Sequence, residues 1–334
     1  MQDVEESQLQ AGSEKRDPAA GGLLPARLPI PPSHRKLQAS LLMGRTLWRG
    51  LGNMSTHRKV LRRFLSCPPL TEIVLSDSFF ALKYLTPNYL AHGLTVPERA
   101  ECILHHYWRL LETLPDAFSR QILHEDVTIH EIIAAGSRFT LTIGLSSTNA
   151  IEGELSLHLQ VDGKIVFVLS FTIVPGRVVE SQASEVLFIT RLQGVKGAYA
   201  EISAATKALH DVAPDALLLA ALQGVAMAFN IDEIAAVSAA RQSSYRRDSA
   251  ASFTEAYDDF FAELGISKGV TGFYHTPVPI ELKPLSLIKP GHKLRTKEKR
   301  AFKQQVALAC AGSLTACGES QNPGRTVPRR LKPR

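Results

Sequence analysis

The sequence is poor in cysteine, and its four cysteines follow no recognisable pattern. They are Cys67, Cys102, Cys310 and Cys317. No two are spaced as in a C-x-x-C pair, so the sequence offers neither a zinc-binding motif nor the dense disulfide framework of a small secreted protein. We therefore expect free thiols in a reducing compartment and no metal site.

The sequence also lacks a long apolar run and a secretory leader. Its first ten residues, MQDVEESQLQ, are acidic and polar, whereas a secretory signal has a basic patch followed by an apolar run. A membrane-spanning helix needs about 20 apolar residues, and the longest candidate, residues 213–231, contains Asp215, Gln223 and Asn230. We interpret this run as a buried core helix and expect a soluble, cytoplasmic protein.

The charge is distributed unevenly along the chain. Charged residues make up 21% and hydrophobic residues 45% of the sequence, which is ordinary for a globular protein, and the net charge is +6. Residues 283–334 hold 13 Lys and Arg against two glutamates, and residues 35–63 hold eight and no acid. Such flanks predict an anionic partner, either a phospholipid surface or nucleic acid. Alternatively, they only keep the protein soluble.

Composition divides the chain into a core and two tails. Residues 1–35 are rich in Gly, Pro, Ala, Glu and Gln and residues 311–334 are basic, and neither region has a hydrophobic period. We expect both tails to be disordered. Residues 36–310 form a single domain in this interpretation, with a helical part at 36–124, a sheet part at 125–280 and a basic segment at 281–310.

The hydrophobic period changes near residue 125 from that of a helix to that of a strand. Before this point, Thr95-Val-Pro-Glu98 has the pattern of a helix start, with a threonine cap and a glutamate at the capping-box position. After it, apolar residues alternate along short segments, and Asp162-Gly163 between two of them predicts a tight hairpin. From residue 185 the order becomes strand, helices, strand, helix, strand. We therefore predict an α+β fold with a mixed, largely antiparallel sheet and helices packed on it.

One segment has the composition of an anion-binding turn. Residues 188–198 (FITRLQGVKGA) leave a predicted strand and open a predicted helix. The free N–H groups and dipole of a helix start favour an anion, and glycine lets a ligand approach the main chain. A later polar loop adds two arginines that could reach a phosphate. The candidate phosphate-binding residues are Arg191, Gln193, Gly194, Lys196, Gly197, Arg246 and Arg247. The alternative is a plain strand-to-helix turn.

This segment resembles the Arg/Gln-x-x-Gly-x-Gly/Ala loop of GNAT-type acyltransferases. Arg191 and Gly194 match the pattern, whereas Lys196 stands where that family has Gly or Ala and Gly197 follows one place late. The later order of strands and helices is also similar to the second half of the GNAT fold. The resemblance implies CoA or acyl-CoA as the cofactor and Tyr257 as the candidate acid for the leaving thiolate. Otherwise Tyr257 is a core aromatic residue.

A more distinctive set of motifs resembles the VirK/YbjX family. The motifs are Arg191-Leu-Gln193-Gly194, Ala205-Thr-Lys207-Ala-Leu209-His210 and Tyr257-Asp258-x-Phe260-Phe261-x-Glu263-Leu264-Gly265. Phe261 replaces a usual Trp, and Asp211-Val-Ala213 replaces a usual Gly-Leu-Arg. The resemblance implies a bacterial protein linked to stress, virulence, DNA damage and antimicrobial-peptide resistance at the envelope. It supplies no catalytic residues.

Three classes of function follow from these patterns. The first is an accessory stress or virulence protein in the cytoplasm, peripheral to the inner membrane. The second is an acyl-CoA-dependent acyltransferase that uses the turn after Arg191. The third is a nucleic-acid-associated stress protein, although the sequence contains no recognised nucleic-acid-reading module.

Overall fold

The computed structural model describes residues 52–77, 79–146 and 150–319. The predicted N-terminal tail at 1–35 and the basic residues 35–51 lie outside the described residues. So does the part of the predicted C-terminal tail from residue 320 onward. Within the described ranges, no helix combines the length and the apolarity needed to cross a bilayer.

Seven strands form one sheet whose spatial order follows the sequence. Neighbouring strands are antiparallel except β5 and β6, which run parallel. The strands are β1 Val127–Ala134, β2 Ser137–Leu145, β3 Leu155–Val161, β4 Lys164–Pro175, β5 Glu185–Gly194, β6 Glu233–Val237 and β7 Phe273–Pro277. The predicted fold class, α+β with a mixed and largely antiparallel sheet, is confirmed.

The hairpin between β3 and β4 forms where Asp162-Gly163 predicts it. Both residues have positive φ angles, 49° and 84°, as a two-residue turn of this kind requires. The flanking residues Val161 and Lys164 pair across it. After its first two residues β4 is buried throughout, because helices cover both faces of the sheet at this central strand.

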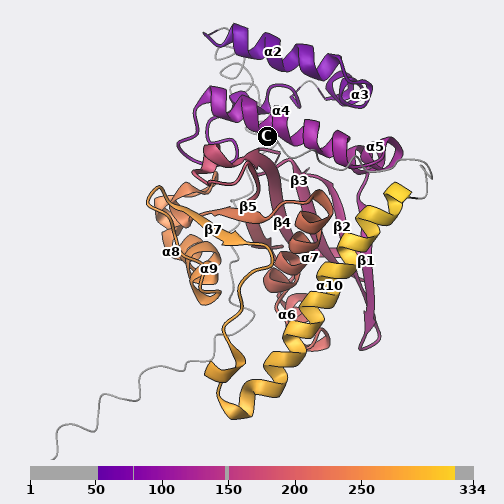
Figure 1. Ribbon diagram of the computed structural model, residues 1–334, viewed down its shortest axis with the longest axis vertical. Helices are drawn as coiled ribbons and strands as arrows, with labels where there is room; N and C mark the ends of the chain where they lie inside the picture. The colour runs from indigo at the N-terminus through magenta and orange to yellow at the C-terminus, as the bar shows by residue number, and fades with distance from the viewer. Residues whose placement is uncertain (1–51, 78, 147–149, 320–334) are drawn as a thin grey trace, which may run out of the picture.

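One face of the sheet carries two layers of helices (Figure 1). Helix α4 (Val96–Thr113) packs on β4, and α5 (Asp116–His124) packs on β2. The predicted capping box at the start of α4 is present, with Thr95 and Glu98 bonding each other's main-chain N–H. Helices α2 (Met54–Leu65) and α3 (Pro68–Ser76) lie outside this layer, and α2 contacts α4.

The other face carries α6 (Tyr199–Ala208), α7 (Pro214–Phe229) and α10 (Lys293–Glu319). Helix α7 is the predicted core helix, and it is buried along most of its length. Gly224 lets α10 approach it, because a Cβ there would collide with the main-chain oxygen of Ala307. Helix α10 runs past residue 310, where the sequence pattern placed the start of the tail, because Cys310 and Leu314 are buried in its packing surface.

The segment before β7 is less regular than its sequence predicts. Amphipathic spacing predicts one helix over residues 253–264, whereas the structure has α8 (Ala250–Phe253), a π-helical turn (Thr254–Asp259) and α9 (Phe260–Glu263). The π turn carries Tyr257 into the core, where its side chain is fully buried. Gly265 ends the segment with a φ of 75°, in the left-handed region that favours glycine.

Candidate functional site

The predicted anion-binding turn lies between the end of β5 and the start of α6. The amide of Val195 still donates to the Val166 oxygen at 2.9 Å, and the Ala198 amide donates to the Val195 oxygen at 3.1 Å. Lys196 and Gly197 form the exposed tip between them. Gly197 has a φ of 83°, and a Cβ on it would touch nothing. The tip is therefore open to the outside, as a ligand-binding turn must be.

The structure separates the predicted residues into two groups. Lys196 and Gly197 lie at the tip, whereas Gly194 is buried, and a Cβ on it would come within 3.0 Å of Ile202 Cδ1. Gly194 therefore lets α6 pack closely on β5. Arg191 lies further back on the strand, with its Nη1 3.4 Å from the Glu152 carboxylate. Gln193 is half-buried opposite Val168 of β4.

Strands β5 and β6 stay together over three residue pairs only, from Leu187–Ile234 to Ile189–Ala236. The next residue of β5, Thr190, is the extra residue of a β-bulge opposite β4, since Arg191 pairs with Ser170 and Ile189 with Phe171. A bulge bends its strand. Beyond Thr190, β5 no longer pairs with β6.

Side chains replace β6 as the partners of β5 beyond the bulge. The Leu192 amide donates to the Tyr257 hydroxyl oxygen at 3.3 Å, and Gln242 Nε2 donates to the Thr190 oxygen at 3.5 Å. Tyr257 is thus a main-chain partner as well as a core aromatic residue. Burial, followed by the nearby Glu152 carboxylate, raises the pKa of the Tyr257 hydroxyl, so the group stays protonated at neutral pH.

Glu152 lies at the centre of a polar cluster beside this divergence. Its carboxylate accepts hydrogen bonds from Gln242 Nε2 at 2.8 Å and from the Ser244 hydroxyl. Its main-chain oxygen accepts from the Thr190 hydroxyl. The Nε of Arg191 is buried and has no hydrogen-bond partner within the part of the chain that the structure describes. The guanidinium therefore retains an unused donor next to the carboxylate.

The two candidate arginines after β6 lie on the surface. Arg246 is two-thirds exposed and pairs with Asp248 at 2.8 Å, and Arg247 is exposed beside it. Ser244 of the same run reaches inward to Glu152. The run therefore connects the cluster around Glu152 to the surface, but the structure shows no contact between its arginines and the described residues of the β5–α6 turn.

A second buried carboxylate, Glu154, was not singled out by sequence reasoning. Lys83 Nζ lies 2.5 Å from it, and the hydroxyls of Tyr89 and Tyr107 both donate to it. The ammonium of Lys83 also lies 4.6 Å from the Phe80 ring centroid. These partners come from α4 and from the loop before it. The only local signal was a pair of glutamates directly before an apolar strand.

Within residues 52–77, 79–146 and 150–319, the histidines form no shared metal site. His158 pairs with Asp126 at 3.0 Å, and His105 pairs with Glu185 at 2.9 Å. Among the described residues, no group of three or more histidine, cysteine or carboxylate side chains could hold a metal ion.

Comparison with known proteins identifies a family. A family model described as "Protein of unknown function (DUF535)" matches residues 44–307, which is most of the chain. This family corresponds to the VirK/YbjX family that the sequence motifs resemble, so that resemblance is confirmed. Neither the curated proteins nor the solved structures provide a match. The stress, virulence and envelope roles therefore gain no support beyond the family itself.

Proposed function

We propose that this chain, a member of the DUF535 family, binds an acyl-CoA where β5 leaves β6 and transfers the acyl group. The main observation that supports this proposal is the divergence of these two parallel strands. Beyond this point the Tyr257 and Gln242 side chains, in place of a strand, bond the main chain of β5, directly before a turn whose tip, at Lys196 and Gly197, is exposed. In this proposal an extended ligand with amides in its chain and a pyrophosphate at one end displaces those side chains and places its pyrophosphate at the turn.

The turn supplies the charge for the pyrophosphate in this proposal. Lys196 is an exposed cation, Gly197 leaves the main chain uncovered, and α6 directs its positive dipole end to the same place. Glu201 in the first turn of α6 opposes binding, because its carboxylate pairs with Lys164 at this helix end. An incoming phosphate has to compete with that carboxylate.

The transfer step needs an acceptor with an amine or hydroxyl group. The acceptor atom attacks the thioester carbon, the new C–N or C–O bond forms, and the C–S bond breaks to give the CoA thiolate. The acceptor's proton leaves to solvent, and the thiolate takes up a proton. Tyr257 is the candidate hydrogen-bond donor to that sulfur, since its raised pKa keeps the hydroxyl protonated.

A thermal-shift titration with CoA tests the binding step. We expect CoA to raise the melting temperature of the full chain and Lys196→Glu to remove most of that rise. Lys207→Glu, an exposed lysine further along α6, serves as the charge-matched control and should keep the rise. Glu201→Gln should enlarge it. No rise at millimolar CoA, or an equal loss in both lysine variants, would contradict the proposal.

A second candidate function is the accessory envelope role, in which a cytoplasmic protein associates with the anionic face of the inner membrane without catalysis. It is favoured by the cations that surround a hollow of about 480 Å³ at the start of α10, among them Lys283, Lys289, Arg295 and Lys299. Together with residues 35–63 they would bind acidic headgroups. Co-sedimentation with anionic vesicles should weaken as salt rises, whereas equal binding to neutral vesicles would contradict this role.

A further inference from the structure

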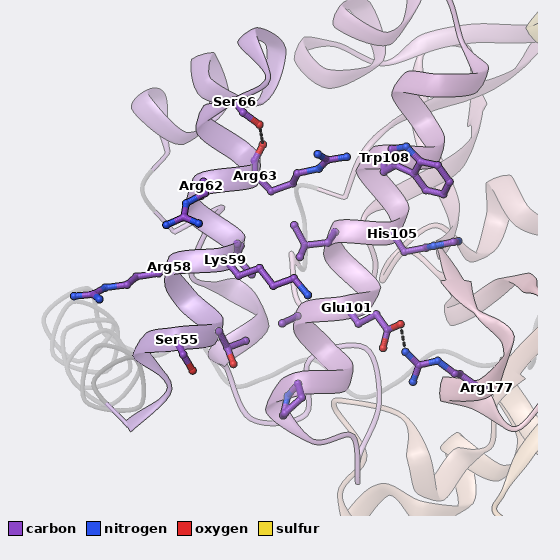
Figure 2. Close-up of a pocket in the computed structure, with 15 residues that line it drawn as sticks. Ser55, Arg58, Lys59, Arg62, Arg63, Ser66, Glu101, His105, Trp108 and Arg177 are labelled. Carbon is purple, nitrogen blue, oxygen red and sulfur yellow. Dashed lines mark hydrogen bonds and ion pairs between the residues drawn. The ribbon is translucent and has the colours of Figure 1, made fainter.

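A hollow lies between α2 and α4, away from the β5–α6 turn. It measures about 1090 Å³, slightly more than the roughly 300–1,000 Å³ typical of small-molecule sites. Figure 2 shows Lys59 and Arg63 reaching from α2 toward α4, while Arg58 and Arg62 point away from it. We call this hollow the α2–α4 groove.

The α2–α4 groove is strongly cationic on its α2 side. Arg58, Lys59, Arg62 and Arg63 are all exposed, and none of them pairs with a carboxylate in the part of the chain that the structure describes. The acid on the α4 side, Glu101, is already paired with Arg177. The groove therefore presents a local excess of positive charge that no described side chain neutralises.

Apolar residues also line the α2–α4 groove, beside polar ones such as Ser55, Thr56, Ser66 and His105. Val60, Ala100 and Leu104 line it, and Trp108 stands at its side with 47% of its surface exposed. Trp108 therefore offers an exposed apolar surface directly beside the unpaired cations. The groove thus combines a charged wall with an apolar floor.

A smaller pocket continues the groove past Trp108. It measures about 360 Å³, and it shares Arg63, Leu104 and Trp108 with the groove. Most of its further lining is apolar or aromatic, including Phe64 and Leu111. The only acid that lines it, Glu112, pairs with Arg109 at 3.1 Å. The apolar surface therefore extends away from the cations in one direction, as the tail of an amphiphile would.

We propose that the α2–α4 groove binds one molecule of a single-chain amphiphile with an anionic head. The head lies between Lys59 and Arg63, and the aliphatic tail passes Trp108 into the smaller pocket. This site is independent of the acyl-CoA site at the β5–α6 turn, since the two share no residue.

Fluorescence titration tests this proposal, because Trp108 reports directly on the groove. The chain has two tryptophans, so Trp48→Phe leaves Trp108 as the only reporter. The probe is dodecyl phosphate below its critical micelle concentration. We expect saturable quenching or a blue shift of the emission, with affinity rising by up to about fourfold per methylene along a series of alkyl phosphates.

Variants locate the head of the ligand. Lys59→Glu/Arg63→Glu should weaken binding at least tenfold. Arg58→Glu/Arg62→Glu makes the same charge change on the same helix, at side chains that border the groove but point away from α4 (Figure 2), and it should weaken binding much less. Circular dichroism checks that both variants are folded.

Three results would overturn the proposal. One is an equal loss of affinity in the two double variants, which would show that binding depends only on the overall charge of α2. Another is equal affinity for inorganic phosphate or dodecyl maltoside, which would remove the need for a tail or for an anionic head. The third is retention on anionic vesicles without any binding of monomeric dodecyl phosphate, which would assign the cations to a membrane surface.

Discussion

Two buried glutamates, separated only by Gly153, behave very differently. Glu154 has an ammonium at 2.5 Å and two phenol donors, and both it and Lys83 are almost completely shielded from solvent. Glu152 has an amide and a hydroxyl donor, but its nearest cation is 3.4 Å away on Arg191, which keeps an unused Nε donor. Both carboxylates are buried. We call the first the closed cluster, because Glu154 is bonded by a cation and two phenols, and the second the open cluster, because Arg191 beside Glu152 keeps an unused donor.

This difference indicates what each carboxylate does in the fold. The partners of Glu154 come from α4 and the loop before it, so this cluster attaches the helical layer to the sheet. The partners of Glu152 come from β5 and from the run after β6, so its cluster spans the place where those strands diverge. We infer that Glu154 serves stability, and that the region of Glu152 can exchange partners when a ligand binds.

The largest expected effect comes from breaking the closed cluster. Glu154→Gln leaves the Lys83 ammonium buried without a counter-charge, so we expect a loss of about 3–5 kcal/mol in the free energy of unfolding. Urea denaturation measures it. The double variant Glu154→Gln/Lys83→Met should be more stable than the single variant, because the buried charge is gone. A loss below about 1 kcal/mol in the single variant would show that water reaches this cluster.

The same substitution in the open cluster should cost less. Glu152→Gln removes the charge beside Arg191, whose side chain is 14% exposed and can turn to solvent. We expect a loss of about 1–2 kcal/mol in urea denaturation, the cost of weakening hydrogen bonds to a charged group. The freed guanidinium should also enlarge the thermal shift caused by CoA. Equal losses for Glu152→Gln and Glu154→Gln would remove the distinction between the two regions.

Acid should weaken the packing of α4 on β4 through His106. Its Nδ1 accepts the Ile173 amide at 3.0 Å, and burial, then Lys83 and His105, hold its pKa well below the usual value. The folded chain therefore keeps this imidazole neutral, while the unfolded chain protonates it below about pH 6.5. The unfolded state binds more protons, so stability falls as pH drops through that value, by at most about 1.4 kcal/mol per pH unit for this group.

Urea denaturation at pH 7.5, 6.0 and 5.0 measures this dependence. His106→Gln retains an acceptor for the Ile173 amide but cannot be protonated, so its stability should fall less steeply with acid than that of the parent chain. If the stability of the two proteins fell equally with pH, His106 would not be the cause of the dependence.

Local signals predicted much of the fold. Thr95 with Glu98, Asp162 with Gly163, and Gly265 each act within a few residues of the chain, and the structure has the helix start, the hairpin and the helix end that they indicate. The type and order of the elements from β5 to β7 also follow from their periods. What the sequence did not indicate is the π turn around Tyr257 and the continuation of α10, because packing against distant elements decides both.

The candidate site was harder to predict for the same reason. Glu152 bonds to Gln242 and Ser244, which lie about ninety residues away along the chain, and no local pattern records such a contact. The charge on α2 was visible in the sequence, but the apolar wall that α4 adds to it was not. The loop motif placed Arg191 and Lys196 together, whereas the bulge at Thr190 and the pairing with Glu152 assign Arg191 to the interior.

The smallest predicted effect concerns the tip of the turn itself. Gly197 has a φ of 83° and open space around its Cα, so Gly197→Ala suffers conformational strain but no collision, at a cost of about 1 kcal/mol. Gly197→Asn should cost less, since asparagine tolerates the left-handed region better. Both measurements come from urea denaturation. If alanine proved as stable as glycine, the turn would be adaptable, and the acyl-CoA proposal would lose the preformed tip on which it depends.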